Sequence, residues 1–98
     1  MTLRLDPRLG ATVFFFSDID DRHNRTGQWA RTWGEDFAVD GIAQVAICKL
    51  PAESGYNLLC LSAGGYVIFD SAHDTLEEAR ACAEAEFGGL RDTWQNAP

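Results

Sequence analysis

Apolar and polar residues alternate along several segments of the chain, and this period of two predicts β-strands. In residues 42–49, apolar side chains at every second position give one face that a core can bury. Residues 56–61 and 66–70 are two further short apolar segments. The glycines at 64 and 65 between them can supply the positive φ of a tight turn. The pattern therefore predicts a β-hairpin formed by these two segments.

A period near 3.6 follows the hairpin and predicts an amphipathic helix over residues 75–87. One face of this helix carries Leu76, Ala79, Cys82, Ala83 and Phe87. Two capping boxes compete for its start, because Asp74 with Glu77 and Thr75 with Glu78 both have the required spacing. The two glycines that follow Phe87 predict the end of the helix.

Two segments of the first half show less regular patterns. Residues 11–16 are rich in β-branched and aromatic residues and predict a strand. Three consecutive phenylalanines in this segment place apolar groups on both faces, which is typical of a strand covered on both sides. Trp29, Trp33 and Phe37 recur every four residues and predict a short helix over 28–37.

Together these elements predict an α+β fold in which an antiparallel sheet of about four strands packs against the C-terminal helix. The 98 residues correspond to a single domain, 1–98. The hairpin strands carry apolar side chains on both faces, yet the sequence offers one long helix to cover them. We expect the second face to be packed either by residues 29–37 or by another chain. The latter arrangement would be a homodimer or an interface with a ligand protein.

Composition favours a globular protein of the cytoplasm. Apolar residues make up 46% of the chain and charged residues 23%. No apolar run approaches the roughly 20 residues of a membrane span, and residues 1–7 lack the apolar core of a signal peptide. The three cysteines lie in apolar stretches without paired spacing, so we expect free thiols, with a Cys48–Cys60 bridge as the alternative.

Charge is distributed unevenly along the chain. The net charge is −7, and residues 1–33 contribute +1 whereas residues 34–98 contribute −8. Such a negative field repels nucleic-acid backbones and attracts basic proteins. It also keeps a protein soluble, which is the simpler interpretation.

The sequence from Ser17 to Asp21 is the first candidate for chemistry. A strand followed by Asp-x-Asp is similar to the nucleophile motif of haloacid-dehalogenase-type phosphatases, but 98 residues are too few for their scaffold. We interpret this segment as a solvated acidic loop, or as a binding loop for a basic partner. The candidate partner-binding residues are Asp18, Asp20 and Asp21 in the loop, followed by Trp29 and Trp33, because aromatic residues are enriched at interface hot spots.

Neither His73 nor Glu86 gives the pattern of a reaction centre. Ser71 and His73 do not suggest a catalytic triad, since side chains two residues apart in a turn rarely point at one another. Metal binding by His23, His73 and a nearby aspartate is an alternative. Glu86 falls on the inward side of the predicted helix and needs a partner, such as the Trp94 indole, a tyrosine hydroxyl or an arginine. We therefore assign no catalytic, cofactor-binding or metal-binding residue.

The second half of the chain resembles a set of small bacterial proteins. They share a Gly-Tyr strand, a hairpin, an Asp-x-x-His-Asp-like junction, a Leu-Glu-Glu-Ala helix, a Glu-Phe pair and a late tryptophan. The matching residues here are Gly55-Tyr56, Asp70 to Asp74, Leu76 to Ala79, Glu86-Phe87 and Trp94, so the resemblance covers about residues 55–94. Several of those proteins are regarded as immunity proteins of polymorphic toxin or contact-dependent inhibition systems. The resemblance implies a stoichiometric inhibitor with no catalytic residues.

The leading hypothesis is therefore a cytoplasmic, non-catalytic protein-binding module of the immunity type that neutralises a basic toxin. It predicts no cofactor and no nucleic-acid or membrane partner. A small accessory or homo-oligomeric domain, which forms a homodimer through the second sheet face, is one alternative. A small metal-dependent hydrolase with a site at Asp70, His73 and Glu86 is another.

Overall fold

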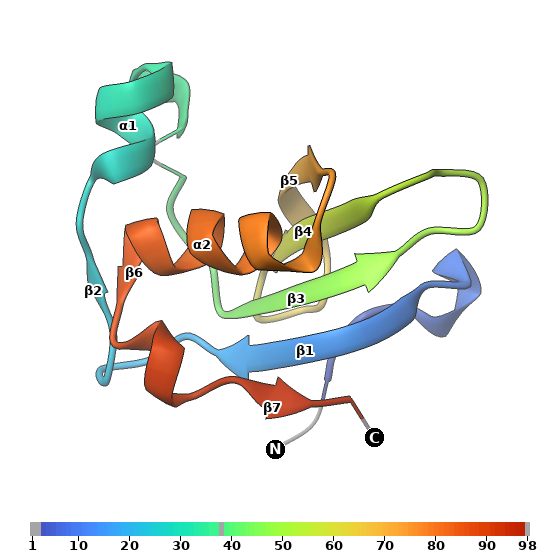
Figure 1. The fold of residues 1–98 in the computed structure, drawn as a ribbon. Coiled ribbons are helices and arrows are strands. Elements are labelled where there is room, and N and C mark those ends of the chain that lie inside the picture. The colour runs from blue at the N-terminus through green and yellow to red at the C-terminus, as the bar shows by residue number, and fades with distance from the viewer. Residues whose placement is uncertain (1–2, 38, 98) are drawn as a thin grey trace.

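The computed structural model describes residues 3–37 and 39–97, and its centre is a five-stranded antiparallel sheet (Figure 1). The strand order is β5-β4-β3-β1-β7. The strands are β1 (Thr12–Asp18), β3 (Gln44–Lys49), β4 (Tyr56–Leu61), β5 (Val67–His73) and β7 (Gln95–Asn96). Each neighbouring pair in this order is antiparallel. The sheet therefore has β5 at one edge and the two-residue strand β7 at the other.

Two helices lie on one side of the sheet, and α2 lies over it, roughly along β1 and β3 (Figure 1). They are α1 (Gln28–Trp33) and α2 (Leu76–Glu86), and a small second sheet pairs β2 (Asn24–Arg25) with β6 (Phe87–Gly88). Three short 3-10 helices span Pro7–Leu9, Glu35–Phe37 and Leu90–Asp92. Within the described residues, none of the helices is long and apolar enough to cross a membrane.

The predicted α+β class is confirmed, with shifts at the ends of elements. The strand expected over 66–70 continues to His73, and the one expected over 11–16 continues to Asp18. The strand expected over 42–49 begins at Gln44. The helix expected over 28–37 is interrupted at Gly34, whose φ of 112° is a conformation that favours glycine, so that α1 is followed by a separate 3-10 helix.

Thr75, rather than Asp74, is the N-cap of α2. Its hydroxyl accepts a hydrogen bond from the backbone N–H of Glu78 at 3.1 Å. The Glu78 carboxylate reaches back to the backbone N–H of Asp74 at 3.2 Å. Of the two capping boxes that the sequence allowed, the Thr75–Glu78 pair therefore sets the start of the helix.

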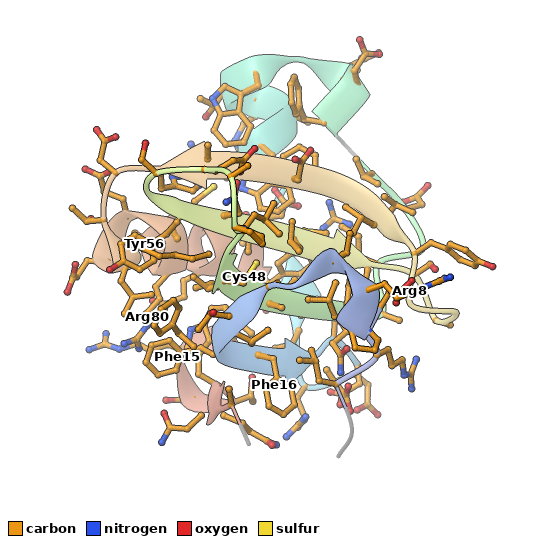
Figure 2. The ribbon with its side chains drawn as sticks, turned by 90° about the vertical axis from the view of Figure 1, so that its right-hand side faces the viewer. Arg8, Phe15, Phe16, Cys48, Tyr56 and Arg80 are labelled. Carbon is orange, nitrogen blue, oxygen red and sulfur yellow. The ribbon has the colours of Figure 1, made fainter. Side chains whose placement is uncertain are left out.

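The main core lies between the sheet and α2. Its buried members are Trp29, Val45, Ile47, Leu58, Cys60, Ala79, Ala83, Phe87 and Leu90. The register of β1 shifts between Val13 and Phe15, and the rings of Phe14 and Phe15 both contact residues of this side, Tyr56 and Trp94. Figure 2 shows Phe15, Tyr56 and Arg80 on the α2 side of the sheet, and the Arg80 guanidinium lies 5.1 Å from the centre of the Phe15 ring.

The second face of the sheet is covered in part by the N-terminal segment. The expected cover by residues 29–37 was wrong, because Trp29 and Phe37 pack on the α2 side. Leu5, Ala11 and Leu50 pack with Val13 against buried Cys48, Leu59 and Leu61. The backbone N–H of Arg4 also donates to the Gln44 side-chain oxygen at 2.8 Å. The sequence did not predict this cover, because the few apolar residues of the N-terminal segment have no regular spacing.

Candidate functional site

The acidic loop after β1 is held by bonds within the chain. Asp18 accepts a hydrogen bond from the Gln44 side-chain amide at 2.9 Å. Asp20 pairs with Arg22 at 2.9 Å, and this hydrogen-bonded arginine lowers the pKa of Asp20 to about 2. Asp21 is exposed. A partner that binds this loop therefore competes with Arg22 for Asp20, and the binding role of the three aspartates stays a prediction.

The two candidate tryptophans of α1 have different environments. Trp29 is 1% exposed, its ring stacks on Phe69 with centres 4.8 Å apart, and its indole N–H donates to the Cys82 carbonyl at 2.9 Å. Trp33 is 43% exposed and stacks on Trp29 at 6.1 Å. Trp33 can therefore contact a partner directly, whereas Trp29 is almost fully buried and lies beneath the groove that it helps to line.

An apolar groove of about 360 Å³ lies between α1 and α2. Its walls include Thr32 and Trp33 from α1, Ala81 and Ala85 from α2, and His73 and Glu78 where β5 joins α2. Ligand pockets commonly span about 300–1,000 Å³, so this groove has room for one or two side chains rather than for a large cofactor.

Ser71 and His73 meet beside this groove. The Ser71 hydroxyl lies 2.8 Å from His73 Nε2. The expectation that these two side chains do not meet was wrong. Both residues belong to β5 rather than to a turn, and alternate residues of a strand share a face. Burial lowers the pKa of His73, and the nearby Glu78 and Asp74 carboxylates offset part of that shift.

The Ser71–His73 pair has the spacing of a nucleophile and a base. Among the described residues, His73 Nδ1 has no hydrogen bond to a carboxylate that would orient the ring. Cys82, the nearest thiol, has its pKa raised by burial, although hydrogen bonds with Ser71 and Trp29 act in the opposite direction.

Glu86 finds its partner in Arg25, one of the three types that the sequence suggested. The Arg25 Nε lies 2.7 Å from Glu86 Oε2, while the other carboxylate oxygen accepts the backbone N–H of Trp29 at 2.9 Å. Burial raises the pKa of Glu86, but the Trp29 hydrogen bond and Arg25 outweigh it, so that the net pKa lies below its usual value. The Trp94 indole donates instead to Glu84 at 2.7 Å.

Three exposed carboxylates lie where β5 joins α2, and we call Asp74, Glu77 and Glu78 the acidic junction. Asp70 lies within β5 opposite Leu59 and faces the other side of the sheet. Within the described residues, none of the three junction carboxylates is in an ion pair, whereas four of the arginines are paired with acids elsewhere. Glu78 also lines the α1–α2 groove. A negative surface therefore adjoins an apolar one at this place.

The cysteines are free thiols, as the sequence predicted. Cys48 pairs with Asn57 and Cys60 with Val45 in the register, which places the two thiols on opposite faces of the sheet and excludes the alternative bridge. Burial raises the pKa of Cys48 to about 11. In residues 3–37 and 39–97, no group of three or more His, Cys, Asp or Glu side chains is arranged to hold a metal ion.

Comparison of the chain with protein-family models, with curated proteins and with solved structures gave no match. The proposed function therefore rests on the groove and the acidic junction.

Sequence reasoning missed the groove because three separate elements form it. The available signal was weak: Ala81 and Ala85 are small apolar residues on the outward side of α2, where polar residues are usual. The acidic junction was visible as three acids within five residues, but the position of Glu78 in the same groove as Trp33 required the fold.

Proposed function

We propose that this chain is a non-catalytic protein-binding module of the immunity type, which binds and neutralises a basic partner such as a toxin. The observation that carries the proposal is the acidic junction beside an apolar groove, on a chain with a net charge of −7. Clustered carboxylates accelerate association with a basic protein, and a neighbouring apolar surface with an exposed tryptophan supplies contact area.

The resemblance of residues 55–94 to immunity-type proteins supports the same proposal, since the acidic junction lies inside this range. The function would be stoichiometric: the module covers the partner's active surface and needs no reaction of its own. Because Asp18 and Asp20 are already bonded within the chain, the proposed contact surface is the acidic junction with Trp33 rather than the loop after β1.

Two neutralising double variants test the proposal. Asp74→Asn with Glu77→Gln changes the acidic junction, and Glu53→Gln with Asp92→Asn removes two exposed acids elsewhere, so that both variants have a net charge of −5. The partner is first captured from cells that produce the protein and identified. The purified pair is then titrated at low and at moderate salt.

We expect the junction variant to bind about tenfold more weakly at low salt and to show a smaller dependence on salt, because each lost contact removes a screened attraction. The control variant should bind like the wild type, and the wild type should block the partner's activity at equimolar ratio. Equal weakening in both variants, or failure to retain any protein at low salt, would count against the proposal.

Self-association is a second candidate function, and exposed apolar residues at the start of β5 favour it. Tyr66, Val67 and Ile68 are 76%, 42% and 37% exposed, and β5 is an edge strand with β4 on one side. Light scattering at micromolar concentration distinguishes the two candidates. We expect the monomer mass of 10.8 kDa, and twice that mass would favour the homodimer.

A further inference from the structure

The charge and shape of the α1–α2 groove define the group that it can receive. Glu78 is the one acidic side chain among the described residues that line it, and the remaining lining is mostly apolar. His73 also lines the groove, and burial lowers its pKa, which favours the neutral imidazole. The groove therefore combines an apolar floor with one negative charge at its rim.

The aromatic wall of the groove is held in place before any partner arrives. Trp33 stacks on Trp29, with ring planes 27° apart, and meets Phe37 edge-on with centres 5.4 Å apart. Because Trp29 is buried in the core, the Trp33 ring has a fixed support. Pre-organised aromatic side chains contribute more to binding, since little conformational entropy is lost on contact.

The Glu78 carboxylate is likewise positioned. One oxygen accepts the Asp74 backbone N–H at 3.2 Å, and no hydrogen bond within the described residues occupies the other. The side chain thus offers an oriented acceptor at the rim of the groove.

From this arrangement we infer that the α1–α2 groove receives an arginine side chain of the protein partner, with its aliphatic stem along Ala81 and Ala85 and its guanidinium between Trp33 and Glu78. A guanidinium is planar, stacks on indole rings and donates in a fork to a carboxylate, so it matches this pair of neighbours better than a compact ammonium group does. The inference rests on the proposed function, because it names the group by which the partner is recognised.

The test is a titration of the full chain with n-butylguanidinium chloride, followed by NMR of the Trp33 indole N–H and of the Ala81 and Ala85 amides. We expect saturable shifts at these three groups. We expect the Glu78→Gln variant to bind about fivefold more weakly, which is the effect of one partly exposed ion pair. The matched control is Glu53→Gln, which removes the same charge from an exposed position that does not line the groove, and it should bind like the wild type.

Two further probes share the four-carbon stem. Equal affinity for n-butanol would show an apolar groove without recognition of charge, and equal affinity for n-butylammonium would show a general cation site. Either result overturns the inference, and so do shifts that are insensitive to Glu78→Gln or spread evenly over the acidic surface.

The failure of this inference is distinguishable from the failure of the proposed function. If Asp74→Asn with Glu77→Gln weakens binding to the protein partner and Glu78→Gln does not, the module binds a basic protein without using the groove. If n-butylguanidinium binds as expected but no protein partner depends on the acidic junction, the proposed function fails while the chemistry of the groove stands.

Discussion

The Trp29→Ala variant is expected to unfold with a free energy about 4 kcal/mol lower than that of the wild type, within the range for removal of a fully buried tryptophan. Trp29 is 1% exposed, and its ring contacts Phe69 and Phe87, with centres 4.8 and 5.5 Å away. Its indole N–H also satisfies the Cys82 carbonyl. Because this side chain joins α1 to β5 and α2, its loss leaves a cavity and removes the support of Trp33.

Urea denaturation measures this effect, and Trp33→Ala is the matched control on the same helix. Trp33 is 43% exposed, so its removal should cost about 1 kcal/mol. A Trp29→Phe variant should recover about half of the loss, since the ring contacts largely remain and the indole hydrogen bond does not. A cost below 1 kcal/mol for Trp29→Ala would mean that α1 is not docked on the sheet.

The parts of the fold that were predictable have local signals. The spacing of apolar residues, two adjacent glycines and a capping box predict the hairpin and α2, and each of these signals extends over only a few residues. The strand β7 and the β2–β6 pair are two residues long and have no period to detect, because pairing with distant partners creates them. Such short strands depend on tertiary contacts rather than on propensity.

Distant contacts also explain what was missed at the candidate site. The sequence showed that Glu86 faces inward and needs a partner, yet it did not show which arginine supplies one, since Arg25 lies 61 residues away. The contact between Ser71 and His73 was missed because the strand continues three residues beyond its expected end at 70. In both cases the sequence identified the residues themselves. It did not show where the strand ends or which distant residue lies beside them.

The Glu86→Ala variant should lose about 3 kcal/mol of stability, because it removes one partner of a buried, hydrogen-bonded charge pair. Glu86 is 2% exposed, and its carboxylate accepts from Arg25 and from the backbone N–H groups of Gly27 and Trp29. Without it, the start of α1 lacks its acceptor and the Arg25 charge lacks its counterion. Glu84→Ala is the control, since Glu84 is a quarter exposed and should cost about 1 kcal/mol.

The pH dependence of stability tests the same ion pair independently. The folded-state pKa of Glu86 is lowered, so its contribution is complete above the usual carboxyl pKa and is lost as the pH falls through that value toward the lowered one. We expect the wild type to lose stability in urea denaturation as the pH falls below about 4.5. The Glu86→Gln variant, which keeps an acceptor for the Trp29 N–H but cannot titrate, should start less stable and lose less over the same range. Parallel pH profiles for the two proteins would mean that Glu86 titrates alike in the folded and unfolded chains, and the Arg25–Glu86 pair would then contribute nothing to holding α1 against α2.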